Sequence, residues 1–302
     1  MQNRLAIVPF MLLCSITACS GGGGSNLCDV NADCDSGFCK ADGTCGPSST
    51  DDGGAGDDTQ PDGNTDLCSP NADGMITQAE LPLRAGKMAR FRVATDATFD
   101  TAGTTTGGMR TWDLSGALSG DTDEPITLDA PGTAYWAADF PTASYATPIS
   151  ASSDLLGIFH VDATAVTLLG VVSPTAGSSG TNVSYDPPAT ILSLPVTSGG
   201  HWKSTSNVVG TYQGSYVNYD ETYESNVDQT GTMKTPYGSF PVMRIATTLD
   251  QTGIVFPYTK FGGYHSFAWT AECFGSVANV TSQSLEDSTE FNDPSEVKRL
   301  IP

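Results

Sequence analysis

The sequence predicts an all-β protein whose main domain, residues 67–302, is an antiparallel β-sandwich or a curved half-barrel. Three observations predict this class. Apolar and polar side chains alternate along several segments, Gly- and Pro-rich turn sequences separate these segments, and no long stretch repeats with a helical period. A domain of roughly 235 residues has the size of one large β-domain or of a tight pair.

The alternation is plainest in two segments. Residues 216–227 read YVNYDETYESNV and place four apolar side chains on one face: Val217, Tyr219, Tyr223 and Val227. Residues 265–273 read HSFAWTAEC and place a second set on one face: Phe267, Trp269, Ala271 and Cys273. Each segment therefore predicts a strand with one buried face and one polar face.

Shorter apolar runs and turn sequences complete the β pattern. The apolar runs predict short buried strands at residues 155–159, 166–172 and 191–196. Turn signals rich in Gly and Pro lie at residues 129–132, 198–200 and 235–238. The stretch nearest to a helical period is residues 294–300, close to the C-terminus.

Residues 1–18 are predicted to be the signal peptide of an exported lipoprotein. A basic start, MQNR, precedes a short apolar run and small residues before Cys19. Ile16-Thr17-Ala18-Cys19 resembles the lipobox of bacterial lipoproteins, which implies that Cys19 becomes the N-terminus and carries acyl chains such as palmitate. Ser20 follows, and in this resemblance the absence of aspartate there favours the outer membrane. The alternatives are an ordinary signal peptide and a buried helix.

Three segments join this N-terminus to the β-domain. Residues 19–27 form a lipidated, flexible Gly/Ser tether. Residues 28–45 are a cysteine-rich module too small for an apolar core, so disulfides must hold it together. We interpret this module as a protease-resistant spacer, with a small binding module as the alternative. Residues 46–66 are rich in Asp and Gly and lack large apolar side chains, which predicts a disordered acidic linker.

The cysteine count predicts three disulfides. Loss of the signal peptide and lipidation of Cys19 leave six cysteines: Cys28, Cys34, Cys39, Cys45, Cys68 and Cys273. An even number in an exported chain indicates disulfides. The first four allow three pairings, and we prefer Cys28–Cys39 with Cys34–Cys45 because pairing neighbours would leave two independent loops. The last disulfide would join Cys68 to Cys273. A zinc site is disfavoured because no CxxC pair or nearby histidine accompanies these cysteines.

Residues 69–80, SPNADGMITQAE, resemble the calcium-binding loop of an EF-hand. Asn71, Asp73 and Glu80 fall at ligand positions, and a glycine falls where such a loop turns sharply. Ser69 stands where the first carboxylate is expected, so calcium would bind weakly. A type I turn that enters a strand is the alternative. We expect no other cofactor.

The charge balance and the scattered histidines restrict the function. The chain has 13 basic and 34 acidic residues and a formal net charge of -21. Such a surface repels nucleic acid, which excludes nucleic-acid binding. His160, His201 and His265 lie far apart in the sequence, and no GxSxG or HExxH motif is present. We therefore expect a non-enzymatic protein without catalytic residues.

Three stretches carry a family resemblance. Residues 28–45, with DCDSGFC at their centre, resemble short cysteine-rich modules of exported proteins of myxobacteria and their relatives. MRTWDLS (109–115) and GTMKTPYGSFPVMRI (231–245) resemble motifs of surface lipoproteins of myxobacteria and of β-rich exported domains of other gliding bacteria. The second resemblance covers roughly residues 67–300. It implies an exported β-rich domain near a lipid anchor and no particular activity.

The leading hypothesis is an outer-membrane lipoprotein whose β-domain binds another cell-envelope component, a protein or a glycan. The membrane is a further partner through the lipid on Cys19. The alternative is a carrier or sensor of an apolar ligand in a half-barrel pocket. A hollow core lined by the four tryptophans would favour the carrier: Trp112, Trp136, Trp202 and Trp269. A hydrolase is the third hypothesis, and it needs histidines and carboxylates clustered in one cleft.

Overall fold

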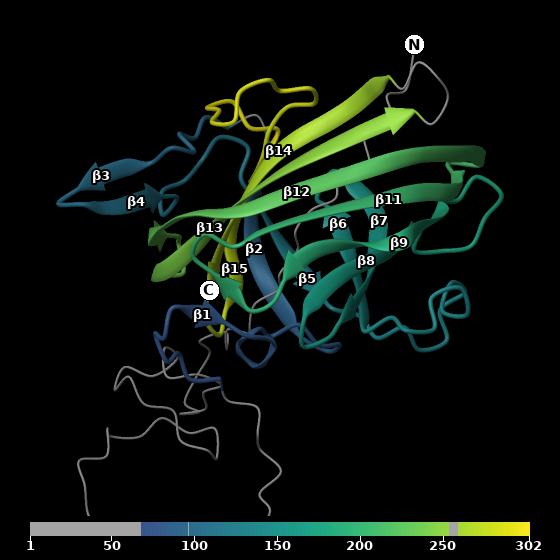
Figure 1. The fold of residues 1–302 in the computed structure, drawn as a ribbon, viewed down its shortest axis with the longest axis horizontal. Helices are drawn as coiled ribbons and strands as arrows, with labels where there is room; N and C mark the ends of the chain where they lie inside the picture. The colour runs from purple at the N-terminus through teal and green to yellow at the C-terminus, as the bar shows by residue number, and fades with distance from the viewer. Residues whose placement is uncertain (1–67, 96, 254–258) are drawn as a thin grey trace, which may run out of the picture.

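The computed structural model describes residues 68–95, 97–253 and 259–302 (Figure 1). Four of the predicted segments lie outside the described residues. They are the signal peptide, the tether with Cys19, the acidic linker and the module that contains Cys28, Cys34, Cys39 and Cys45. In the described part of the chain, no helix is long and apolar enough to cross a membrane.

The described residues form β-strands and one short 3-10 helix, and they contain no α-helix. In chain order the elements are β1 (Met75–Ile76), η2 (Gln78–Glu80), β2 (Met88–Ala94), β3 (Thr104–Thr106), β4 (Met109–Asp113), β5 (Thr122–Thr127), β6 (Tyr145–Ser150), β7 (Ser153–Val161), β8 (Ala165–Val172), β9 (Asn182–Ser193), β10 (Val196–Thr197), β11 (His201–Tyr212), β12 (Ser215–Lys234), β13 (Ser239–Gly253), β14 (Lys260–Ala271), β15 (Gly275–Thr281) and β16 (Glu296–Leu300). The prediction of an all-β fold is confirmed.

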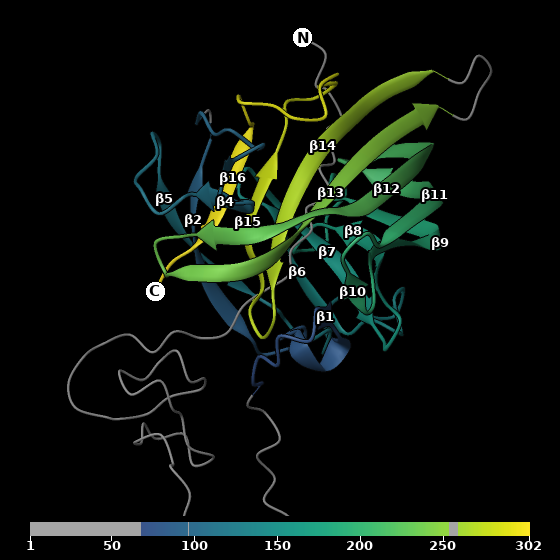
Figure 2. The same cartoon turned by 60° about the vertical axis from the view of Figure 1, so that its left-hand side comes forward.

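Most strands belong to one strongly curved antiparallel sheet (Figure 2). The strand order is β5-β2-β16-β15-β14-β13-β12-β11-β9-β8-β7-β6. Just beyond β5, Asp129 pairs with Ala146 of β6 through two backbone hydrogen bonds of 2.8 Å. The curved sheet is therefore nearly closed and barrel-like, which leaves few unpaired backbone groups at its edges.

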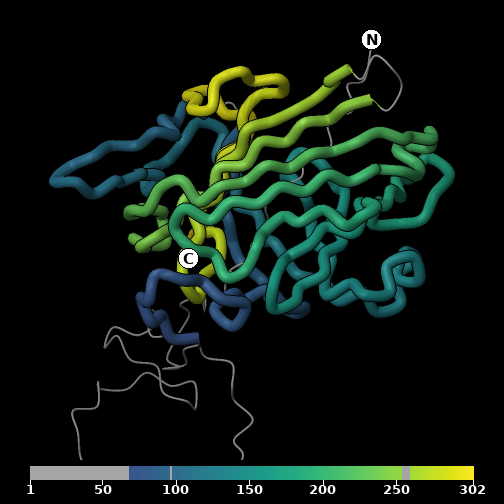
Figure 3. The backbone as a smooth tube through the Cα atoms, viewed as in Figure 1, coloured from purple at the N-terminus to yellow at the C-terminus, as the bar shows by residue number. Residues whose placement is uncertain are grey.

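The two segments with the plainest alternation lie in β12 and, up to Ala271, in β14. The polar face expected on β14 is wrong, because all residues from Phe267 to Ala271 are buried, Thr270 included. On β12, Tyr219, Tyr223 and Val227 are buried, as predicted. The same face also buries Glu221 and Ser225, which the polar–apolar pattern does not reveal. The predicted turn at residues 235–238 joins β12 to β13. Strands β12 and β13 run side by side across the molecule (Figure 3).

The helical period at residues 294–300 is misleading, because this stretch contains strand β16. All five residues of β16 are buried, since β15 and β2 pair with its two edges. Arg299 is accommodated there because it donates to the Asp121 carboxylate at 2.6 Å and to the Leu114 carbonyl at 3.1 Å. Pairing on both sides thus overrides the weak local preference for a helix.

The tryptophans are packed among other side chains. Trp112 and Trp269 are 1% and 0% exposed and meet edge to face, with ring centroids 5.6 Å apart. Trp136 lies in a separate small apolar cluster with Phe140, and Trp202 is partly buried against the main core. The four tryptophans therefore do not line one shared cavity.

A buried carboxyl group lies within the curved sheet. Glu221 is 0% exposed and accepts hydrogen bonds from the Tyr223 hydroxyl at 2.6 Å, from the Tyr219 hydroxyl at 3.2 Å and from Gln251 Nε2 at 2.8 Å. Burial raises the pKa of Glu221, although these hydrogen bonds oppose the rise. Burial also raises the pKa values of Tyr219 and Tyr223, so both phenols remain protonated donors.

Replacing Glu221 by Gln is expected to flatten the dependence of stability on pH. A raised folded pKa means that the folded protein holds this proton more tightly than the unfolded chain. The stability that this proton gives is fully present below pH 4.5, the ordinary pKa of a glutamate. It is lost as the pH rises through the pKa of Glu221 in the folded protein. Each pKa unit of difference corresponds to about 1.4 kcal/mol. Urea unfolding from mildly acidic to mildly alkaline pH measures this loss.

Glu224→Gln is the matched control for this prediction. Glu224 lies on the same strand but is exposed, and its hydrogen bond with Lys203 lowers its pKa. Its stabilising contribution is lost only as the pH falls through that lowered value. Above pH 4.5, the free energy of unfolding of this control should therefore change with pH as it does in the wild type. A Glu221→Gln variant with the same slope as the wild type would contradict the prediction.

Candidate functional site

An apolar groove lies where three separate parts of the chain converge. Its volume is about 590 Å³. One wall is the loop that leads into β1, the second is the tip of the β3–β4 hairpin, and the third is formed by β12, β13 and the end of β14. The main apolar side chains that line it are Ile76, Met109, Phe240, Val242, Met243 and Phe274.

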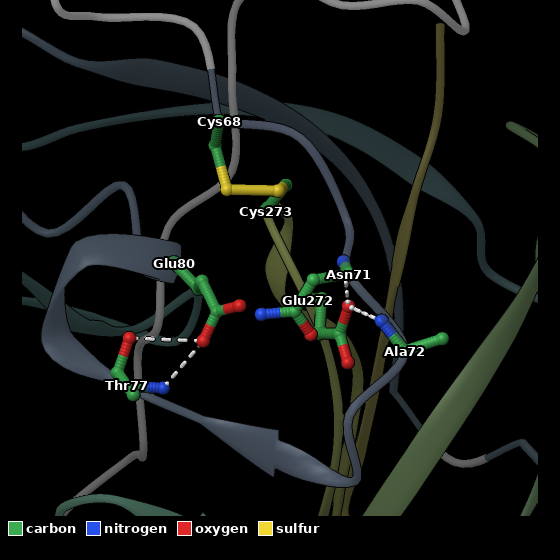
Figure 4. The surroundings of a disulfide bond; sticks show 7 residues. All are labelled: Cys68, Asn71, Ala72, Thr77, Glu80, Glu272 and Cys273. Carbon is green, nitrogen blue, oxygen red and sulfur yellow. Dashed lines mark hydrogen bonds between the residues drawn. A yellow bond between two sulfur atoms is a disulfide. The ribbon is translucent and has the colours of Figure 1, made fainter.

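The first wall is held in place by a disulfide and by one carboxylate (Figure 4). Cys68 and Cys273 are bonded, with their Cα atoms 5.4 Å apart, as the sequence predicts. Next to Cys273, one oxygen of Glu272 accepts the backbone N–H groups of Asn71 and Ala72, each at 2.9 Å. The loop is therefore attached to the end of β14 by a covalent bond and two charge-assisted hydrogen bonds.

The candidate calcium loop uses its oxygen atoms within the protein. Asn71 Oδ1 accepts the Asp73 backbone N–H at 2.9 Å, and Asp73 Oδ1 accepts the Met75 N–H at 2.8 Å. Glu80 accepts from the backbone N–H and the hydroxyl of Thr77 at 2.8 and 2.9 Å and so caps η2 (Figure 4). Among the described residues, no three His, Cys, Asp or Glu side chains form a group suited to a metal ion. Calcium binding remains a prediction, and the arrangement of Glu80 does not favour it.

The second wall depends on close contact between β4 and β12. These strands pair in parallel, with Arg110 opposite Gly231 and Trp112 opposite Met233. A Cβ atom on Gly231 would lie 2.4 Å from the Arg110 carbonyl oxygen, so only glycine allows this approach. The β3–β4 hairpin projects from the sheet (Figure 3), and Met109 at its tip is 64% exposed.

Two charged residues, Arg110 and Glu272, line the groove. Arg110 Nη1 donates to the Ala102 carbonyl, and Glu272 accepts from the loop backbone. Both side chains therefore have partners within the protein. None of the four tryptophans lines the groove, and the predicted half-barrel pocket does not coincide with it.

A smaller cleft of about 190 Å³ brings together residue types that a hydrolase would use. His265, Asp228 and Glu290 all line it. Both carboxylates, however, form ion pairs with the buried guanidinium of Arg244. An oxygen of Glu290 lies 2.7 Å from Arg244 Nη2. His265 Nδ1 lies 3.1 Å from Thr248 Oγ1, and no carboxylate in the described part of the chain hydrogen-bonds to this ring. The cleft therefore lacks an oriented base with a free carboxylate partner.

The other two histidines lie elsewhere on the surface. His160 Nδ1 lies 2.6 Å from the Thr142 carbonyl oxygen, and His201 Nε2 lies 3.4 Å from Glu224. The structure therefore does not gather the three histidines into one site.

Sequence reasoning did not identify the groove, although it singled out two of its segments. Residues 109–115 and 231–245 carry the family resemblance, and they pair with each other as β4 and β12. They could be read only as strand and turn signatures, because nothing local shows that they meet the loop at residues 70–76. Comparisons of the chain with protein-family models, curated proteins and solved structures found no match.

Proposed function

We propose that this protein is a non-enzymatic lipoprotein of the outer membrane whose β-domain binds another cell-envelope component, a protein or a glycan. The apolar groove is the observation that carries this proposal. Open grooves with apolar walls are common recognition sites, because apolar surface gains free energy when a partner covers it. The signal peptide and Cys19 read from the sequence support the location.

The place where the N-terminal segment joins the domain also supports the proposal. Cys68 is the first described residue, and its disulfide partner Cys273 lies between two groove residues, Glu272 and Phe274. The segment that leads to Cys19 therefore joins the β-domain beside the groove. A partner that resides in the envelope would then be held at a high local concentration near its site.

A carrier of an apolar ligand is the second candidate, because of the size of the groove. A volume of about 590 Å³ is within the usual range for small-molecule sites. The packing of Trp112 and Trp269 against each other does not support a carrier with a tryptophan-lined core.

Photo-crosslinking through the groove tests the proposed function. A benzophenone amino acid would replace Ser239, which is exposed, lines the groove and is the first residue of β13. The matched control is Ser215, which is exposed and is the first residue of β12, at the opposite end of that strand from the groove. The full chain would be irradiated in the cells that make it, and adducts would be identified by mass spectrometry. We expect an envelope component crosslinked at position 239 and not at 215; equal labelling, or none, would refute the proposal.

A further inference from the structure

A second, polar cavity adjoins the groove. Its volume is about 280 Å³, and it shares Gly108, Arg110 and Thr230 with the groove. Its remaining lining includes the side chains of Thr105, Ser198 and Gln229. The surface therefore changes from apolar to polar across the junction between the β3–β4 hairpin and β12.

The polar cavity has side chains that are available for hydrogen bonding. Within the described part of the chain, Thr105, Ser198, Gln229 and Thr230 make no side-chain hydrogen bond, and three of the four are exposed. Hydroxyl and amide groups both donate and accept. A ligand rich in hydroxyl groups could satisfy several of them at once.

The charges at the polar cavity favour an uncharged ligand. Arg110 and Asp228 both line it, so one positive and one negative group oppose each other. Arg110 donates to the Ala102 carbonyl, and Asp228 accepts from Arg244 Nε at 3.0 Å, so each charge already has a partner. The formal net charge of -21 also disfavours a phosphate or carboxylate.

We infer that the groove and the polar cavity together bind one amphipathic molecule, with its apolar chain in the groove and an uncharged, hydroxyl-rich head in the cavity. This is the chemistry of a glycolipid. The inference rests on the proposed function and names the class of envelope component that is bound. The N-terminal segment joins the domain beside the groove, so a lipid anchor on Cys19 would keep the site near a membrane that contains such molecules.

Simple alkyl glycosides test this inference with the full chain. The probes are octyl glucoside, glucose and octanoate, and their binding is measured by isothermal titration calorimetry. The two amphiphiles, octyl glucoside and octanoate, are used below their micelle-forming concentrations. Octyl glucoside should bind more tightly than glucose, which lacks the apolar chain. It should also bind more tightly than octanoate, which carries a charge in place of the sugar. Equal or tighter binding of octanoate would overturn the inference.

Three variants locate the binding. Ser239→Trp should abolish octyl glucoside binding by filling the groove, while Ser215→Trp should leave it unchanged; both positions are exposed at the start of a strand, where Trp is well tolerated. Gln229→Met keeps the size of the side chain and removes its amide. It should weaken octyl glucoside binding about 2- to 10-fold, as expected for one hydrogen bond. No effect of Gln229→Met would overturn the assignment of the head to the polar cavity.

The outcomes separate the inference from the proposed function. A protein crosslinked at position 239, with no glycoside binding, would overturn the inference and leave the proposed function standing. No crosslinking and no glycoside binding would overturn both. Crosslinking at position 239 together with glycoside binding that Ser239→Trp abolishes would support both.

Discussion

Replacing Cys68 and Cys273 together by serine is expected to lower the free energy of unfolding by about 4–5 kcal/mol. The disulfide joins residues 205 positions apart, so its loss frees a very long loop in the unfolded chain. The Cα separation of 5.4 Å is usual for a disulfide, so the folded state accommodates the bond. Urea unfolding of the full chain would measure the loss.

A double alanine variant is the control for the disulfide prediction. Cys273 is 1% exposed, so a serine hydroxyl there adds a polar burial cost that alanine avoids. If loop closure is the main cause, the double serine and double alanine variants should lose similar amounts of the free energy of unfolding. Unchanged stability in the alanine variant would contradict the prediction.

Replacing Arg244 by Leu is expected to cost about 2–3 kcal/mol of stability, between the values usual for exposed and for fully buried ion pairs, because the guanidinium is buried and its carboxylate partners are partly exposed. The Arg244 side chain is 3% exposed and bridges Asp228 and Glu290. Its guanidinium also donates to the Thr101 carbonyl at 2.7 Å and lies 4.3 Å from the centroid of the Phe267 ring. Leucine would remove the cation that Asp228 and Glu290 share and would leave Asp228 without its donor. Among the described residues, the Thr101 carbonyl would keep only the hydrogen bond from Trp112 Nε1, and Glu290 would keep only that from the Thr101 hydroxyl.

Two controls separate charge from geometry at Arg244. Arg244→Lys keeps the charge, but an ammonium group lacks the planar geometry with which a guanidinium binds two carboxylates. This variant should therefore lose an intermediate amount of stability. Arg92→Leu removes an ion pair with Asp123 that is open to solvent and should lose much less. Chemical unfolding of the three variants would rank them. An Arg244→Leu loss no larger than that of Arg92→Leu would contradict the prediction.

The buried polar residues show where sequence patterns lose their predictive power. The alternation around Tyr219 and Tyr223 predicts a strand because a period of two is local. It assigns no role to Glu221, whose buried carboxyl group accepts a hydrogen bond from Gln251 on the neighbouring strand. Likewise, β16 carries Lys298 and Arg299 and gives no strand signal of its own, because its burial comes from pairing with β2 and β15.

The candidate site shows the same division. The loop at residues 70–76, Met109, Ser239 and Phe274 lie far apart in the sequence, and each is unremarkable alone. Turn chemistry predicts the hairpin at residues 235–238 but not which distant segment lies beside it. The register of β4 with β12, the disulfide and the hydrogen bonds to Glu272 bring these segments around one groove.

The sequence by itself determined the all-β class, strand segments of β7, β8, β12 and β14, and the Cys68–Cys273 pair. The single strand expected at residues 191–196 is wrong, because the chain there is divided between the end of β9 and the start of β10. Side-chain periodicity, turn residues and cysteine parity are properties that a chain carries locally or by count. Only the tertiary structure decided the near closure of the sheet, the burial of Glu221 and Arg244, and the groove with its polar neighbour. These features depend on which strands pair and in which register, and a short-range pattern does not specify pairing between distant segments.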